Sequence, residues 1–186
     1  MGNRSAAGSG GSGAGYGGII KIPNLITARL VVGEGGTGQS IDINTTPPAS
    51  TAGKASSLTY SGTTIISAGG GTQGSSNQYH STAGTGGTLI TNFTESIRYF
   101  MSNGNNGNRN EGSKSLSVEG AASVYTGHTY GKSGGAEGNP GGGKGYPSKH
   151  GYAYIRYIGS NPIVFESDEA GEHEFYVSTT GTYHID

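Results

Sequence analysis

Histidine is the side chain most able to move protons or bind a metal at neutral pH, and the chain has five of them. They are His80, His128, His150, His173 and His184, and none stands at the HxH or HExxH spacing that brings two imidazoles to one metal. The chain has no cysteine, which removes thiolate metal sites and disulfide bonds. The sequence therefore predicts no metal site and no cofactor.

Three glycine-containing motifs approach those of nucleotide-binding proteins or hydrolases. Residues 8–13 match GxGxxG, residues 126–133 approach a P-loop, and residues 131–135 match GxSxG. Each of these motifs needs a helix directly after it, and here more glycine or a strand pattern follows. No nucleophile, base and orienting group assemble, so we predict that the chain is not an enzyme.

Carboxylates gather in residues 166–174, which contain Glu166, Asp168, Glu169, Glu172 and Glu174. The spacing is not that of an EF-hand, and a charged hairpin is favoured over a calcium site. The sequence up to residue 159 carries a net charge of +5, and residues 160–186 carry −6. This complementarity fits the steering of one chain's tail onto the body of another copy, and it fits a solvated acidic hairpin at least equally well.

Tyrosine and asparagine supply the candidate ligand-facing residues. Tyr130 and Tyr146 lie beside glycine blocks, where a ring either caps the backbone or stacks on a sugar. Asn105, Asn106 and Asn108 lie in an Asn/Gly-rich stretch, where their amides either bind a ligand or only tolerate turn conformations.

Glycine dominates the composition, with 38 of 186 residues, yet the net charge is only −1 and the apolar residues gather in runs that need burial. We therefore expect a folded protein. No apolar run reaches the ~18 residues of a membrane span. The bases are scattered singly, which argues against nucleic-acid binding.

Alternation and turn residues predict several strands. Pro23 and Asn24 separate two of them, and Ser61 and Gly62 turn a hairpin. Residues 88–102 fit a short helix or a strand equally well. The predicted strands are residues 19–22, 26–32 and 151–158, the predicted hairpin covers residues 57–71, and a final alternating stretch carries Phe175, Val177, Tyr183 and Ile185.

Glycine runs that are not linkers have one ordered alternative, the extended threefold polyproline-II helix, which bonds laterally to neighbours when no Cβ intervenes. The strict collagen period is absent. The predicted fold class is therefore mainly β, a glycine-rich polyglycine or polyproline-II helix bundle with antiparallel β-strands and little or no α-helix.

Five pieces of the sequence occur together: an alternating strand, a glycine block, two strands that each run into glycines, and a closing "GYAYIRY". They are residues 175–185, 6–18, 30–36, 64–71 and 151–157. With these pieces the chain resembles the glycine-rich domains of bacteriophage tail-fibre and adhesin proteins and of the anaplastic lymphoma kinase ectodomain, in which the alternating strand is the lead-in strand.

The resemblance implies a structural or recognition role. It also shows an unusual order, because the lead-in strand, first in the family, comes last here. We expect a glycine-rich body over residues 1–159 and an acidic C-terminal extension over residues 160–186. The extension either folds back on its own chain or supplies the missing strand of the next copy, and we favour the next copy.

These observations predict a non-enzymatic, self-assembling structural protein of a phage virion surface or fibre, which assembles head to tail by strand complementation. The expected partners are other copies, other virion proteins or cell-surface glycan. No signal peptide is recognisable, so we expect a virion-surface or extracellular location reached by lysis or after leader removal. The alternatives are a subunit of an extracellular bacterial or archaeal filament and a monomeric glycan-binding adhesin module.

Overall fold

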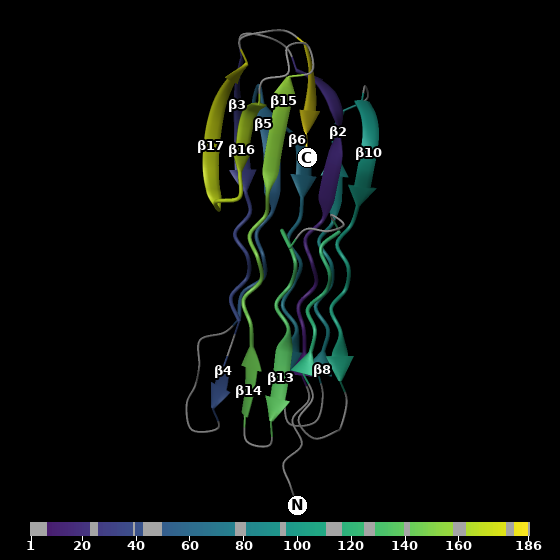
Figure 1. Cartoon of the computed structure of the whole chain (residues 1–186), viewed down its shortest axis with the longest axis vertical. Coiled ribbons are helices and arrows are strands. Elements are labelled where there is room, and N and C mark those ends of the chain that lie inside the picture. The colour runs from purple at the N-terminus through teal and green to yellow at the C-terminus, as the bar shows by residue number, and fades with distance from the viewer. Residues whose placement is uncertain are drawn as a thin grey trace, which may run out of the picture.

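The chain forms a rod with a large β-structure at one end and smaller sheets at the other (Figure 1). The structure is a computed structural model and describes residues 7–22, 26–38, 40–42, 50–76, 81–93, 96–110, 117–124, 129–139, 142–157, 163–177 and 181–185. Every regular element in these residues is a β-strand, and all strand pairs are antiparallel. The mainly β class predicted from the sequence is confirmed.

Two five-stranded sheets make up the larger end. The first has the order β10 (Ser96–Ser102), β2 (Gly15–Ile22), β18 (Gly181–Ile185), β15 (Ala153–Tyr157) and β16 (Ile163–Ser167). The second has the order β17 (Gly171–Val177), β3 (Ile26–Val32), β5 (Ser56–Tyr60), β6 (Thr63–Ala68) and β9 (Leu89–Thr91).

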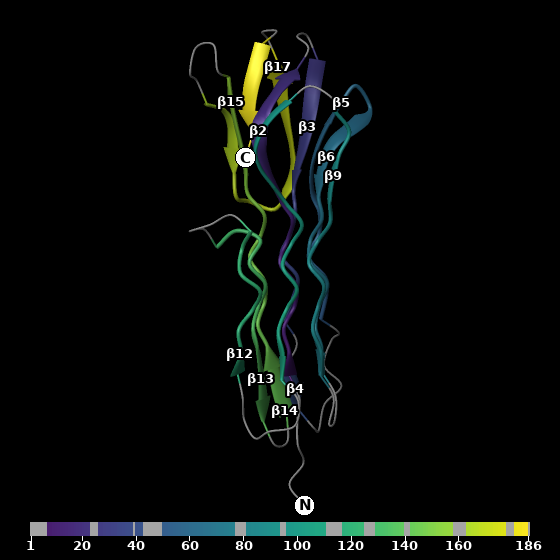
Figure 2. The same ribbon diagram turned by 90° about the vertical axis from the view of Figure 1, so that its right-hand side faces the viewer.

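Shorter strands make up the opposite end, near the N-terminus (Figures 1 and 2). One sheet there has the order β12 (Ser117–Val118), β13 (Ala136–Asn139), β14 (Gly142–Gly145) and β4 (Ser40–Asp42). Two-stranded pairs join β1 (Ala7–Gly8) to β11 (Arg109–Asn110) and β7 (Ser75–Ser76) to β8 (Ser81–Thr82).

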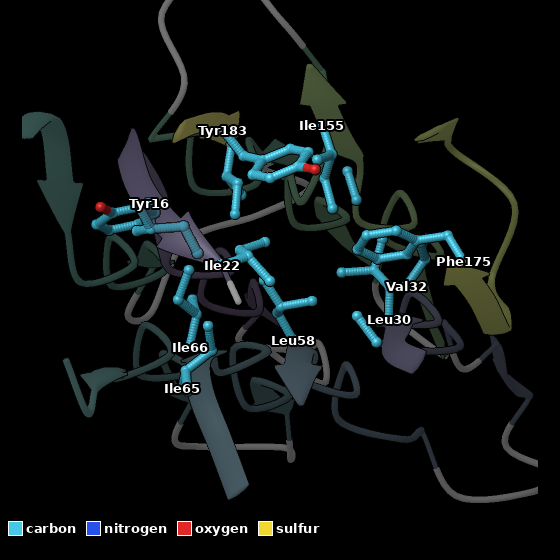
Figure 3. Close-up of a cluster of buried hydrophobic side chains, with 14 residues drawn as sticks. Tyr16, Ile22, Leu30, Val32, Leu58, Ile65, Ile66, Ile155, Phe175 and Tyr183 are labelled. Carbon is cyan, nitrogen blue, oxygen red and sulfur yellow. The ribbon is translucent and has the colours of Figure 1, made fainter. Parts of the chain in front are cut away.

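The apolar core lies between the two large sheets (Figure 3). Ile22, Leu58 and Ile155 are almost completely buried, and Phe175 and Tyr183 join the same cluster from the C-terminal strands. Full burial of an aliphatic side chain stabilises a fold by about 1.5–3 kcal/mol. The large sheets are therefore where the chain buries its few apolar runs.

The predicted hairpin at residues 61 and 62 is confirmed. Ser61 has φ 49° and Gly62 has φ 74°, and these two positive values suit the tight turn between β5 and β6. Residues 88–102, which fitted helix or strand, form β9 and β10 where they are described. β10 pairs along β2, so tertiary pairing decides between two local patterns that were equally good.

Between the two ends the chain passes back and forth as undulating segments that carry no assigned secondary structure (Figures 1 and 2). Each strand of the large sheets continues into one of these segments or begins from one. The exceptions are the C-terminal strands β16, β17 and β18. The segments are residues 9–14, 33–38, 50–55, 69–74, 83–88, 103–108, 119–123, 132–135 and 146–152, and a turn at residues 130 and 131 precedes the eighth.

Candidate functional site

The central segment of the rod, residues 9–14, is bonded through its backbone to several neighbours. Ser9 and Ser12 are buried, with 1% and 0% of their surface exposed. The carbonyl oxygens of the same two serines accept N–H bonds from Gly84 at 2.8 Å and Gly87 at 2.9 Å. The segment's own N–H bonds run from Ser9 to Asn108 O (2.9 Å), Gly11 to Thr72 O (3.0 Å), Ser12 to Asn105 O (2.9 Å), Gly13 to Gly131 O (3.0 Å) and Ala14 to Gly69 O (2.9 Å).

These bonds repeat every three residues. Donors three residues apart, Ser9 and Ser12, reach one neighbouring segment, and Gly11 and Ala14 reach another. The same three-residue step joins residues 148 and 151 to residues 36 and 33. A strand would bond on two opposite sides, whereas this step distributes bonds around the segment.

Close backbone packing explains why glycine fills these segments. A Cβ at Gly11 would overlap the carbonyl oxygen of Thr85, and one at Gly104 would overlap that of Ser12. Gly13 differs, because a Cβ there would be 3.6 Å from its nearest neighbour, Gly69 O. At Gly11 the neighbouring backbone therefore leaves no room for a Cβ, whereas at Gly13 of the same segment a Cβ would fit.

The asparagines predicted to face a ligand hold two segments together. Asn105 Nδ2 donates to Ala122 O at 3.1 Å, and Asn108 Nδ2 donates to Glu119 O at 3.2 Å. On the other side, Asn106 Oδ1 accepts from Gly86 N at 3.0 Å, and Asn103 Oδ1 accepts from Leu89 N at 2.8 Å. The repeat Asn-Gly-Asn over residues 103–108 therefore presents amides to two neighbours and glycine to the central segment.

Hydroxyl groups supply further lateral bonds. Asn105 N and Asn108 N donate to Ser12 Oγ and Ser9 Oγ, both at 2.8 Å, so each serine is bonded to the same partner segment through both its backbone and its hydroxyl. Thr72 and Thr85 are joined by backbone and side-chain bonds of 2.7–3.1 Å. These polar side chains extend the backbone network, and Asn105, Asn108, Thr72 and Thr85 are at the same time exposed to solvent.

The C-terminal strands lie within the large sheets of their own chain. β17 pairs along its whole length with β3, and β18 lies between β2 and β15. Phe175, Tyr183 and Ile185 are buried, and the backbone of Val177 pairs with Ile26. Most of the extension expected over residues 160–186 is therefore part of the sandwich in this structure, where it contributes three of its strands.

The acidic residues of the tail lie on β16 and β17, which are edge strands of different sheets, and on the connection between these strands. Glu172 forms an ion pair with Arg29, and Glu166 accepts a bond of 3.0 Å from the Tyr152 hydroxyl. Asp168, Glu169 and Glu174 are exposed. Among the described residues, no group of three or more His, Cys, Asp or Glu is placed to hold a metal ion.

One charge pair lies on the rod. Lys54 Nζ donates to Glu34 Oε2 at 2.7 Å on the surface, and this hydrogen bond and the lysine charge hold the pKa of the Glu34 carboxyl below its ordinary value. The pair joins neighbouring segments, which are also bonded through Lys54 N and Glu34 O at 2.9 Å.

The two tyrosines predicted to face a ligand lie in different surroundings. Tyr130 stacks on Tyr152, with ring centroids 4.6 Å apart and an interplanar angle of 14°. Tyr146 is 39% exposed and bonds through its backbone to Gly135. The structure brings neither ring to the asparagines, whose amides bond to neighbouring segments.

The bonds that the asparagine amides make to neighbouring segments were not predicted from the sequence. The signal was present as a period of three in Asn-Gly-Asn-Asn-Gly-Asn, residues 103–108.

Of the described residues, none belongs to a helix long and apolar enough to cross a membrane. Comparison with protein-family models, characterised proteins and solved structures found no match.

Proposed function

We propose that the chain is a non-enzymatic structural protein, a stiff rod of a phage virion surface or tail fibre. The observation that supports this best is the backbone network of residues 9–14, which bonds one glycine-rich segment to several others. Such a network uses the chain's polar groups for lateral bonding, and it gives stiffness without a large apolar core.

The glycine segments form, in this proposal, a bundle of polyglycine-II-type helices. Three observations support it: the three-residue step of the hydrogen bonds, the carbonyl groups that occupy the space of a Cβ at Gly11 and Gly104, and the undulating course of the segments in Figure 1. A threefold helix without internal hydrogen bonds has these properties.

A catalytic role has no comparable support. Glu172 and Glu34 pair with Arg29 and Lys54, Glu166 accepts from a tyrosine hydroxyl, and Asp168, Glu169 and Glu174 are exposed. The described imidazoles are used singly, as in the bond of 2.9 Å that His150 Nδ1 accepts from Gly35 N. In the part of the chain that the structure describes, these contacts give no arrangement of acid, base and nucleophile that would favour a catalytic role.

Exchange of β18 between copies is the assembly mechanism that we propose for the fibre. β18 fills the space between β2 and β15, so an acceptor without it has two open strand edges. Only three residues, 178–180, separate β17 from β18. Because an extended chain spans at most about 3.6 Å per residue, an exchanged β18 reaches a sheet that lies close to the end of β17. Copies joined in this way would contact each other at their sandwich ends. The proposal is therefore more specific than the head-to-tail arrangement expected from the sequence, because it names the parts of the two copies that meet.

Engineered cysteines test the exchange directly because the chain has none of its own. Lys21 and Thr182 face each other across β2 and β18. We expect the double variant Lys21→Cys/Thr182→Cys to form disulfide-linked species larger than one chain on a non-reducing gel, and to return to one chain on reduction. Disulfide formation within single chains alone, at micromolar concentration, would refute exchange.

The structural role is tested separately by mass spectrometry of purified virions from the source of the chain. We expect its peptides among the virion proteins at a copy number typical of fibre or surface components. Their absence from virions, together with their recovery from extracellular filaments, would favour the filament alternative.

A further inference from the structure

Where the sandwich meets the glycine segments, one position between two neighbouring runs of chain is not filled by a described segment. At the level of Ile185, β18 lies between Gly18 of β2 and Ile155 of β15. Farther down the rod, Gly131 lies between the same two runs of chain, because Gly13 N donates to its oxygen at 3.0 Å and its own N donates to His150 O at 2.8 Å. β18 and residues 131–135 thus occupy the same position between these two runs of chain, β18 in the sandwich and residues 131–135 farther down the rod.

Between these two levels the flanking chains continue without a described segment that pairs between them. The intervening residues are 14–17 on one side and 151–154 on the other. A cavity of about 110 Å³ lies here, and its lining includes residues from both flanks, namely Ala14, Gly15, Tyr16, Gly151, Tyr152 and Ala153. The cavity reaches inward to Leu30, Leu58 and Ile66 of the core, and Ile185 closes its sandwich end.

The walls are mostly apolar: none of the lining residues is charged, and the polar side chains among them are those of Ser56, Ser57, Ser123 and three tyrosines. Four of the backbone N–H groups in the lining bond within the chain: Gly13 to Gly131 O, Ala14 to Gly69 O, Gly131 to His150 O and Gly151 to Gly33 O. Ser56 Oγ already accepts from Gly33 N at 2.9 Å. A buried water needs two to four free polar partners, so this lining favours an apolar guest over water.

Aromatic rings border the space on several sides. Tyr16, Phe100, Tyr130 and Tyr152 all line it. The Tyr130 and Tyr152 rings are fixed by stacking on each other, and Tyr16 packs edge to face on Phe93 with centroids 5.4 Å apart. Rings held in this way offer edges and faces to another ring without first having to order themselves.

We propose that this cavity is a binding site for a small uncharged molecule of about one aromatic ring. Apolar cavities of about 150 Å³ bind benzene or xenon, and a cavity of 110 Å³ that opens partly to the surface has a comparable capacity. Such a guest joins the core of the sandwich to the first residues of the glycine segments. It therefore stabilises the junction of the two parts, independently of whether the rod belongs to a virion.

Benzene is the probe, and the methyl resonances of Leu30, Leu58 and Ile185 in the full-length chain report its position. We expect saturable shifts of these methyls with a dissociation constant on the order of 1 mM, and a melting temperature that rises by about 2–3 °C at several millimolar benzene. Benzoate, which has the same ring and a charge, should give neither effect, because the lining offers it no counter-charge.

Two variants reduce the space from different walls. Val124→Trp fills it from a half-buried position, and Ala68→Leu fills it from β6. Either variant should abolish the methyl shifts, and the second replaces the first should the first not fold. Ile90→Trp is the matched control, because Ile90 is 54% exposed and does not line the cavity. Absence of saturable shifts in the unmodified chain, or shifts that survive in a folded filled variant, would overturn the assignment.

Discussion

Replacing Gly11 by alanine tests whether the backbones of the rod pack as closely as the structure has them. The added methyl carbon would overlap the carbonyl oxygen of Thr85, and its next neighbours are also backbone atoms, which cannot rotate away as a side chain can. The same residue donates its N–H to Thr72 O at 3.0 Å, so a shift that relieves the overlap also strains this bond.

The expected cost follows from these two effects. Overpacking a close-packed interior costs about 1–3 kcal/mol, and the loss of one backbone hydrogen bond adds about 1 kcal/mol. We therefore expect Gly11→Ala to lower the free energy of unfolding by about 3 kcal/mol. For a chain of this length that corresponds to a melting temperature lower by about 6–12 °C.

Gly13→Ala is the matched control, two residues along the same segment. Its Cβ would lie 3.6 Å from Gly69 O and 3.8 Å from Gly131 Cα, which are ordinary contacts, and neither glycine has a φ in the left-handed range. Alanine at such a position changes stability by about 1 kcal/mol or less, and it can stabilise by restricting the unfolded chain. Urea unfolding followed by circular dichroism measures both variants. Equal stability of the two, within about 0.5 kcal/mol, would refute close backbone packing at Gly11.

Three further predictions concern the lateral bonds, the core and the surface charge pair. Asn105→Ala removes the amide that donates to the neighbouring segment at 3.1 Å, and should cost about 1 kcal/mol and speed amide hydrogen exchange in residues 119–122; unchanged exchange there would contradict the clamping role. Ile155→Ala should cost about 2–5 kcal/mol in urea unfolding because the side chain is fully buried, whereas Ile90→Ala, at a position 54% exposed, should cost under about 0.5 kcal/mol; similar costs would place the core elsewhere. Lys54→Met should raise the pKa of Glu34 toward its ordinary value in an NMR titration, since the lysine hydrogen bond lowers it. In the unmodified chain this pair adds stability above the unfolded carboxyl pKa and loses it as the pH falls through the lowered folded pKa, so a Glu34 pKa unaffected by Lys54→Met would remove the pair as the cause.

Local sequence signals were sufficient to predict the pairing of two strands that follow each other directly in the chain. The Ser61-Gly62 hairpin could be predicted because two turn residues tolerate positive φ and apolar residues flank them. Residues 88–102 could not be decided locally, because β10 is fixed by pairing with β2, about eighty residues earlier in the chain.

The polar residues of the rod were harder to interpret, since their role depends on distant backbone. Asn105 bonds across to Ala122 and Asn106 to Gly86, and neither partner is recognisable from the residues beside the asparagine. The three-residue period was the available signal. It was hard to recognise because asparagine is also favoured in turns. The C-terminal alternation predicted one strand over residues 175–185, and this was wrong in number, because the structure has two strands there, β17 at the edge of one large sheet and β18 inside the other. The alternation continues across residues 178–180, so the sequence pattern alone does not show where one strand ends and the other begins.

The most direct measurement for the backbone network is the detection of scalar couplings across hydrogen bonds by NMR in a deuterated, isotope-labelled sample. The account predicts couplings from Gly11 N to the Thr72 carbonyl carbon, from Ser12 N to that of Asn105, and from Gly87 N to that of Ser12, with slow hydrogen exchange at all three amides. Fast exchange of these amides and absence of the couplings, in a sample whose β2 and β18 amides remain protected, would contradict a rod built from laterally bonded glycine segments.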